Sequence, residues 1–158
     1  MSIISILIIV GSYQDKLDRY YSIKRNGYKA NHPKSTREID LSKELAMALG
    51  CKWEVEVPYG LGRADCLSKD ILIECKKGGT TAEKAAIGQL LLYAYALKFK
   101  ADLAIGIIGK DGLPKPGTLK FAKDFGIIVF YYNVYTCKWK LVPGTNQSGT
   151  NKFREFYL

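Results

Sequence analysis

The distribution of apolar and polar residues along the chain predicts strands that alternate with helices. Segment 53–58 alternates apolar and charged residues up to Pro58, which is typical of a strand with one solvated face. Segment 102–109 is apolar throughout and has the length of a fully buried strand. Further strands are predicted at 63–67, 71–76, 126–132 and 137–142, and the opening apolar residues 1–11 predict one more.

Helical spacing of apolar residues occurs in three other segments. The first begins at Ser35–Glu38, which has the S-x-x-E form of a capping box, and it ends at Gly50. The second covers residues 82–99 and is long and apolar enough to be a central packing helix. A shorter helix is expected at 118–125. Strands on both sides of a long helix predict an α/β fold, in which helices flank a mixed β-sheet core.

The length of 158 residues fits a single domain, residues 1–158, with a core at about 35–142. Residues 1–34 would then be an N-terminal extension, and residues 143–158 a C-terminal tail with a flexible polar connection. The opening apolar run is too short to span a bilayer and lacks the basic start and cleavage site of a signal peptide. We therefore expect an intracellular, cytoplasmic protein that is not secreted and does not bind membranes.

The four cysteines, Cys51, Cys66, Cys75 and Cys137, form no C-x-x-C pair. They lie inside or beside apolar strand-like runs, where a reduced cysteine packs as a small apolar side chain. This placement favours buried, reduced cysteines over a zinc site or a disulfide framework.

The excess of basic residues gives a net charge of +9, from 24 Lys and Arg against 15 Asp and Glu. Lysine and arginine neutralise phosphates and release counterions, so this excess favours nucleic acid as the partner. An anionic membrane surface, or a basic surface that only aids solubility, are the other interpretations.

The segment GRADCLSKDILIECKK, Gly62–Lys77, holds the charges with the clearest chemical meaning. It predicts a hairpin that brings Asp65 beside Glu74, while Lys76 lies on the same face of its strand as Glu74. Two close carboxylates persist only with a compensating cation, and carboxylate oxygens suit Mg²⁺. Lys76 can then orient an attacking water or stabilise negative charge on a phosphate. The alternative is an ordinary surface salt bridge at a strand end.

Two helices add polar residues to this pattern. On a helical wheel Glu38 falls in the middle of the apolar face of the first helix, whereas Asp40 and Glu44 fall outside it. An acid on a buried face needs a partner inside the protein. Gln89 and Tyr93 are four residues apart on the helix after the hairpin and therefore share a face. The alternatives are a capping-box glutamate and the polar edges of a core helix.

Taken together, the pattern resembles the PD-(D/E)XK nuclease superfamily, in the branch with a Q-x-x-x-Y helix motif. RAD followed by IECK is the specific part of this resemblance, which covers about residues 35–108. The resemblance implies a restriction-endonuclease-like fold and Mg²⁺-dependent hydrolysis of phosphodiesters, with Mn²⁺ as a substitute. Six residues carry it: Glu38, Asp65, Glu74, Lys76, Gln89 and Tyr93.

The resemblance also implies a role for each of these residues. Asp65, Glu74 and the backbone carbonyl of Cys75 would bind the metal, and Glu38 would complete the acidic cluster. Lys76 would be the catalytic lysine, and the Q-x-x-x-Y residues would steady the site or the DNA backbone.

The chain departs from the family pattern in two places. Ala64 stands where the proline of the family name is expected, which leaves the metal role of Asp65 intact. The cysteines do not have the arrangement found in iron–sulfur relatives, so no iron–sulfur cluster is expected. For the acid of the first helix, Glu44 is the alternative to Glu38.

These observations lead to three functional hypotheses. The first is a metal-dependent nuclease that cuts double- or single-stranded DNA, as an exonuclease or a general endonuclease. The second is a structure-specific endonuclease similar to a Holliday-junction resolvase, acting as a homodimer. The third is a non-catalytic basic module, with base stacking on Tyr20, Tyr21, Tyr131 and Tyr132; packing in the core is the favoured interpretation of these tyrosines.

Overall fold

The computed structural model is a mixed α/β fold built on one seven-stranded sheet with the strand order β1-β7-β6-β5-β4-β3-β2. It describes residues 18–20, 22–23, 26, 28–29, 37–109, 113–145 and 151–157. The predicted strand at residues 1–11 lies outside this range. The strands are β1 (Tyr28–Lys29), β2 (Lys52–Val57), β3 (Gly62–Leu67), β4 (Ile71–Lys77), β5 (Asp102–Gly109), β6 (Ile127–Asn133) and β7 (Lys138–Leu141).

The centre of the sheet is parallel and its two sides are antiparallel. β4, β5 and β6 run in the same direction, whereas β2 with β3, β3 with β4 and β6 with β7 are antiparallel pairs. Residues 103–108 of β5 are all buried, because helices cover both faces of the central strands. The edge strand β2 instead exposes alternate residues, as its sequence pattern predicts.

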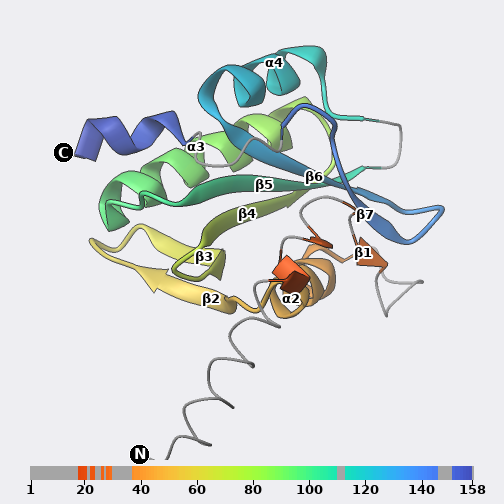
Figure 1. The fold of residues 1–158 in the computed structure, drawn as a ribbon, viewed down its shortest axis with the longest axis horizontal. Coiled ribbons are helices and arrows are strands. Elements are labelled where there is room, and N and C mark those ends of the chain that lie inside the picture. Colours follow the sequence, from red (N-terminus) through yellow and green to blue (C-terminus); the bar gives the residue numbers. More distant parts are fainter. Residues whose placement is uncertain are drawn as a thin grey trace, which may run out of the picture.

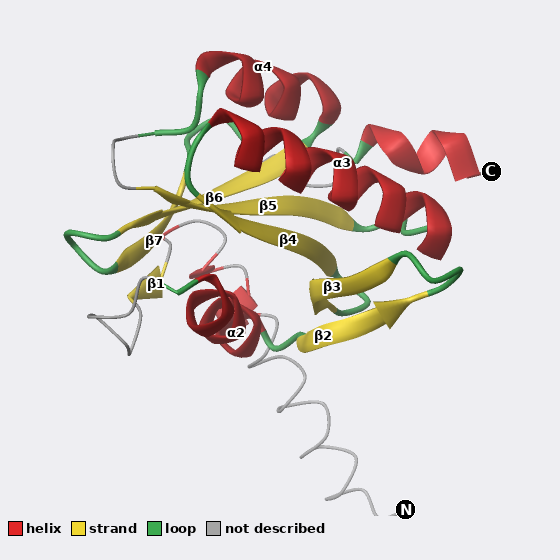
Figure 2. Cartoon of the chain, turned by 180° about the vertical axis from the view of Figure 1, so that it is seen from behind, coloured by secondary structure: helices red, strands yellow, loops and turns green. Residues whose placement is uncertain are grey.

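In the part of the chain that the structure describes, the long helices α2, α3 and α4 cover the sheet, with one on the first face and two on the second (Figures 1 and 2). Helix α2 (Glu38–Leu49) packs against β2, β3 and β4 through residues such as Leu41 and Leu45. Helix α3 (Thr80–Leu97) packs on β4 and β5, and α4 (Pro116–Phe125) packs on β6. The prediction of a mixed sheet flanked by helices is confirmed.

The predicted end of α2 is confirmed, but its predicted start is wrong. Gly50 adopts the left-handed conformation, with φ of 72°, and its N–H donates to the last carbonyls of the helix. At the other end the helix begins at Glu38 after the extended residue Arg37, which makes no side-chain capping hydrogen bond. Glu38 is therefore the first helical residue instead of the fourth residue of a capping box, and Ser35 lies outside the described residues.

Packing in the core accounts for three of the four tyrosines considered for base stacking. Tyr20, Tyr131 and Tyr132 are buried, and Tyr132 packs on the buried Trp139 with ring centroids 5.3 Å apart. Tyr21 lies outside the described residues. The core interpretation is therefore correct for the described tyrosines.

The C-terminal residues dock on the same face as α3 and α4. A short 3₁₀ helix, η1 (Lys152–Tyr157), lies beside α3, and Phe153 stacks on Phe125 of α4 with centroids 5.1 Å apart. The buried side chain of Asn151 donates from Nδ2 to the carbonyl oxygens of Phe99, at 3.3 Å, and Ala101, at 2.7 Å. The last described residues therefore contribute to the core.

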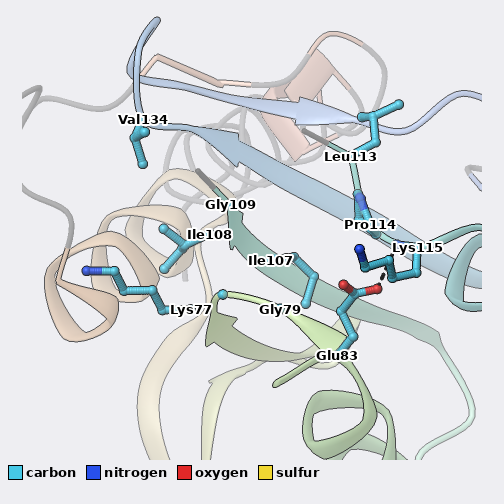
Figure 3. A pocket seen from close by; sticks show the side chains of 11 residues that line it. Lys77, Gly79, Glu83, Ile107, Ile108, Gly109, Leu113, Pro114, Lys115 and Val134 are labelled. Carbon is cyan, nitrogen blue, oxygen red and sulfur yellow. Dashed lines mark hydrogen bonds between the residues drawn. The ribbon is translucent and has the colours of Figure 1, made fainter. Parts of the chain in front are cut away.

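The parallel strands β4 and β5 end beside a hollow of about 460 Å³ (Figure 3). Ligands of parallel α/β sheets commonly bind outside the carboxyl ends of the strands. No helix in the described part of the chain is long and apolar enough to cross a membrane.

Candidate active site

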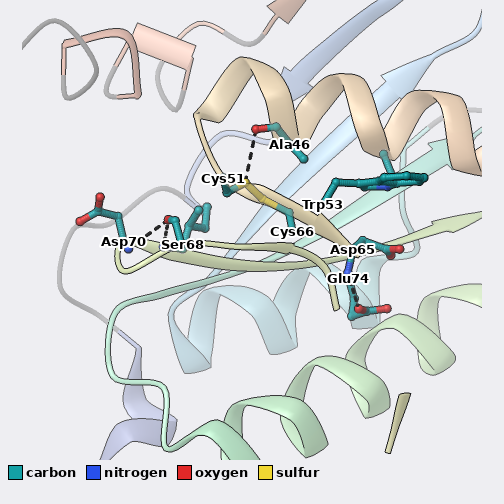
Figure 4. The surroundings of a disulfide bond; sticks show 10 residues. Ala46, Cys51, Trp53, Asp65, Cys66, Ser68, Asp70 and Glu74 are labelled. Carbon is teal, nitrogen blue, oxygen red and sulfur yellow. Dashed lines mark hydrogen bonds between the residues drawn. A yellow bond between two sulfur atoms is a disulfide. The ribbon is translucent and has the colours of Figure 1, made fainter. Parts of the chain in front are cut away.

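Asp65 on β3 and Glu74 on β4 lie side by side, and each carboxylate accepts a hydrogen bond from a backbone N–H of the other strand (Figure 4). The backbone N–H of Asp65 donates to Oε1 of Glu74 at 3.1 Å, and the backbone N–H of Cys75 donates to Oδ2 of Asp65 at 2.7 Å. The regular ladder between the two strands includes Cys66 and Leu67 but not Asp65, the residue that precedes Cys66. The two carboxylates therefore take the place of backbone carbonyls where strand pairing stops, and this exchange fixes both side chains.

The strand on the other side of Asp65 is also interrupted. In the register of β2 with β3, Trp53 pairs with Cys66 and Val55 pairs with Ala64, so Glu54 stands opposite Asp65. Glu54 has φ of 50°, a left-handed conformation that residues with a side chain rarely adopt and that costs about 1–3 kcal/mol. The sequence pattern of alternating residues in β2 gave no sign of this kink. Asp65 therefore lies where the regular pairing is broken on both of its sides.

Burial and mutual repulsion raise the pKa values of both acids. Burial, followed by the charge of Asp65, raises the pKa of Glu74 to about 9, and the Glu74 side chain is only 2% exposed. Burial also raises the pKa of Asp65; the N–H of Cys75 opposes this shift, and the charge of Glu38 adds to it. At neutral pH the pair retains a proton unless a cation compensates the second charge.

Lys76 and Glu38 lie beside this pair. Lys76 Nζ is 3.9 Å from Glu38 Oε1, and Glu38 Oε2 accepts a hydrogen bond from the backbone N–H of Lys77 at 3.3 Å. The positive charge of Lys76 lowers the pKa values of Asp65 and Glu74, against the larger effect of burial. The start of α2 thus brings the carboxylate of Glu38, and the end of β4 brings the ammonium group of Lys76, to the Asp65–Glu74 pair.

The wheel argument that selected Glu38 is corrected in one respect. Glu38 is only half-buried, at the first turn of α2, whereas Glu44 is 7% exposed, although it was predicted to lie outside the buried face. The reason is that the buried face of α2 is wide: residues such as Tyr20 and Ile23 belong to the same core as its apolar side chains. The pKa of Tyr132 on β6 is raised by burial, then by Cys137, and finally by the charge of Glu44. Glu44 therefore lies in a different part of the core from Asp65.

Helix α3 contributes Tyr93 to the site. Its hydroxyl donates to the carbonyl oxygen of Leu61 at 3.4 Å, at the start of the β3 side of the hairpin. Burial, and then the charges of Glu74 and Asp65, raise the pKa of Tyr93, which is 5% exposed. Gln89 is half-buried one turn earlier, and within the described residues it makes no hydrogen bond to the two acids.

Gly62 explains how closely Tyr93 can approach the hairpin. Its φ is 125°, and a Cβ atom at this position would lie 2.7 Å from the Tyr93 hydroxyl oxygen. Only glycine combines this conformation with this contact. The Gly-rich turn YGLG was the sequence signal, but its partner on α3 was not predictable from spacing.

The donor set can be compared with the needs of a divalent cation. The charge of Lys76 compensates the two adjacent carboxylates only in part, since their pKa values stay raised, and Mg²⁺ prefers one or two carboxylates completed by water and substrate phosphate. Asp65 and Glu74 fit this requirement, and the Cys75 carbonyl belongs to the residue between Glu74 and Lys76. Among the described residues, no set of three or more His, Cys, Asp and Glu side chains could hold a metal ion. Glu38 is a neighbour of the pair, since its charge raises the pKa of Asp65.

A disulfide bond joins Cys51 to Cys66, next to Asp65 (Figure 4). The prediction of reduced cysteines is therefore wrong for this pair. The register of the hairpin explains the pairing: Trp53 lies opposite Cys66, and the turn after α2 brings Cys51 to a Cα–Cα distance of 5.7 Å. Cys75 is outside the disulfide and buried, as expected; Cys137 also forms no disulfide but is half-buried.

Scans of known protein families, curated proteins and solved structures gave no match to this chain.

Proposed function

We propose that this protein is a metal-dependent nuclease that hydrolyses phosphodiester bonds in DNA, on a restriction-endonuclease-like arrangement of the sheet and helices. The observation that carries the proposal is a pair of hydrogen bonds, from the backbone N–H of Asp65 to Glu74 and from the backbone N–H of Cys75 to Asp65. They hold the buried carboxylate of Glu74 and the half-buried carboxylate of Asp65 together beside Lys76. A stable protein gains little from such a pair, because burial of two acids costs free energy without a cation. A catalytic site can use the same pair of carboxylates to bind a cation.

In this proposal Asp65 and Glu74, with the backbone carbonyl of Cys75, hold Mg²⁺. The bound ion would lower the pKa of a water molecule and stabilise negative charge on the phosphate. Lys76 donates hydrogen bonds to the attacking water or to a phosphate oxygen, and Glu38 positions the ammonium group of Lys76. Tyr93 holds the start of β3 against α3 and so keeps Asp65 in place.

DNA as the substrate is supported by the charge of the chain. The net charge of +9 favours a polyanion, and phosphodiester chemistry requires the phosphate backbone to approach two carboxylates. A basic surface around an acidic site offsets that repulsion.

The test is cleavage of labelled linear, circular, single-stranded and four-way-junction DNA in Mg²⁺, Mn²⁺ or EDTA. We expect cleavage only with the metal, and a loss of about 100-fold or more in kcat for Lys76→Gln, because a charge-stabilising donor contributes this much. Lys100→Gln is the matched control, since Lys100 is exposed and lies just before β5, at the opposite end of the parallel strands from Lys76.

Equal cleavage in EDTA, or undiminished cleavage by Lys76→Gln, would refute the proposal. Preferential cleavage of four-way junctions by a dimer would instead assign a junction resolvase. DNA binding without any cleavage would assign a non-catalytic basic module.

A further inference from the structure

Three adjoining hollows lie at the carboxyl ends of the central strands. The first, of about 460 Å³, lies between the ends of β4 and β5 and the segment before α4. The second, of about 450 Å³, shares Leu113 with the first and extends over β6 and β7. The third, of about 440 Å³, shares Lys115 with the first and lies between α3 and α4. We call the three together the basic groove.

The basic groove begins one residue away from the proposed catalytic lysine. Lys77, Gly78 and Gly79 line the first hollow, and Lys77 directly follows Lys76 on β4. A substrate strand with one phosphate at Lys76 would place its neighbouring nucleotides at this opening. A volume of about 450 Å³ falls in the range of pockets that hold small ligands, so each hollow can accept a nucleotide.

The charge of the groove is suited to phosphate. Every hollow has at least one lysine in its lining: Lys77 and Lys115 in the first, Lys140 in the second, and Lys84 and Lys115 in the third. Figure 3 shows Lys77 and Lys115 at opposite ends of the first hollow.

Glu83 is the one acid among the described residues that line the groove. It is 4% exposed, and its Oε1 accepts the backbone N–H of Lys115 at 2.9 Å. This bond ties the segment before α4 to the first turn of α3, so the carboxylate serves to hold the wall of the groove in place (Figure 3).

The walls of the groove are apolar and partly aromatic. Ile107 and Ile108 line the first hollow, Tyr131 and Tyr135 the second, and Phe121 the third. Ile107, Ile108 and Tyr131 are buried, so of these side chains the exposed Tyr135 and the half-buried Phe121 can contact the face of a nucleobase. Such faces are accessible in a single strand but are stacked in a duplex.

Tyr135 is the aromatic residue best placed for stacking. Its side chain is 79% exposed, in the turn between β6 and β7. The turn is preorganised, because Asn133 Oδ1 accepts the backbone N–H groups of Tyr135, at 2.8 Å, and Thr136, at 3.2 Å. An exposed ring on a fixed turn loses little freedom when a base stacks on it.

We propose that the basic groove binds a single strand of DNA, with phosphates on Lys115 and Lys140 and a base stacked on Tyr135. The inference rests on the proposed nuclease function and deepens it, since it makes single-stranded DNA, or the single-stranded end of a duplex, the preferred substrate.

The test measures binding separately from cleavage. Fluorescence anisotropy in EDTA compares a labelled oligothymidine with a duplex of the same length, over a range of salt concentrations. We expect tighter binding of the single strand and a loss of about tenfold for Tyr135→Ala, with retention of affinity in Tyr135→Phe. Lys115→Gln and Lys140→Gln should each reduce the slope of log K against log salt by about 0.7.

Two variants outside the groove serve as matched controls. Lys100→Gln removes a lysine just before β5, at the opposite end of the parallel strands, and Tyr95→Ala removes a ring that is 66% exposed near the end of α3. Both should bind the oligothymidine as the unmodified protein does.

Equal affinity for single strand and duplex would overturn the inference, as would groove variants that behave like the two controls. If the groove variants lose affinity but the protein cleaves no DNA with any metal, the groove stands and the nuclease proposal fails. If metal-dependent cleavage occurs and Tyr135→Ala leaves both binding and cleavage unchanged, the groove fails and the nuclease proposal stands.

Discussion

Replacing Glu74 by glutamine should make the metal-free protein more stable and less active. The neutral amide has nearly the shape of the carboxylic acid, and its Oε1 can still accept the backbone N–H of Asp65. What the substitution removes is the cost of keeping a proton on a side chain that is 2% exposed and next to another acid, when the unfolded chain would release that proton. Stability gained by neutralising a strained site, at the expense of activity, is expected when the carboxylate is retained for function.

The magnitude follows from the pKa of Glu74, which burial and Asp65 raise from 4.5 to about 9. Because the folded pKa is raised, the unfolded chain releases its proton first, and stability falls as pH rises from 4.5 to about 9. At pH 7 the interval above 4.5 corresponds to a loss of about 3 kcal/mol at about 1.4 kcal/mol per pH unit. Relaxation around the ionised pair reduces this figure, so we expect Glu74→Gln to raise the free energy of unfolding by about 1–3 kcal/mol.

The assay is urea unfolding in EDTA at pH 5, 7 and 9, repeated with Mg²⁺. The advantage of Glu74→Gln should be small at pH 5, grow toward pH 9, and shrink or reverse when Mg²⁺ stabilises the unmodified protein. Glu56→Gln, on an exposed position of β2, is the control and should show no such dependence on pH. A Glu74→Gln protein that is less stable than the unmodified one in EDTA, or a difference that is independent of pH, would refute the reasoning.

Three further predictions concern the parts of the fold that support the site. Reduction of the Cys51–Cys66 bond should lower the free energy of unfolding by about 3 kcal/mol, since the bond closes a loop with a sequence separation of 15. Urea titrations with and without a dithiol measure the difference in stability, and coincident unfolding curves would contradict the prediction. Gly62→Ala should lower the free energy of unfolding, measured by thermal unfolding, by about 3 kcal/mol or more. Gly60→Ala is the control and should cost about 1 kcal/mol, because its left-handed backbone has open space for a Cβ atom. Equal costs would exclude the close contact between Gly62 and the Tyr93 hydroxyl. Asn151→Ala should cost about 2 kcal/mol by removing two hydrogen bonds to buried carbonyls, and an unchanged melting temperature would show that the C-terminal residues are not docked.

The strands and the hairpin were predictable because their signals are local. The apolar run 71–76 and the turn before it set the register, and the separation of nine residues between Asp65 and Glu74 then follows from antiparallel pairing. The helix after Gly78–Thr81 was predictable for the same reason, since its apolar spacing extends over many turns.

The contacts that depend on distant segments were not predictable from spacing. Cys51 and Cys66 looked like buried apolar residues, and only the three-dimensional path of the chain after α2 brings their sulfur atoms together. Glu44 was assigned to a solvated face because a helical wheel cannot include segments that pack on the helix from a second side. The docking of Asn151 on the loop after α3 depends likewise on a contact across 50 residues.

Asp65 lies where regular strand pairing is broken on both sides. Glu54 adopts a left-handed backbone on one side of Asp65, and the ladder with β4 ends at Cys66 on the other. An ordinary surface salt bridge requires neither the left-handed backbone of Glu54 nor the end of the β3–β4 ladder, because surface ion pairs form on regularly paired strands. Here the backbone N–H groups of Asp65 and Cys75 donate to carboxylates instead of to the carbonyls of a neighbouring strand. Regular strand pairing is therefore lost where the two acids are oriented. Backbone distortion that is concentrated at one pair of acids is the arrangement expected where those acids must be held in place for a ligand.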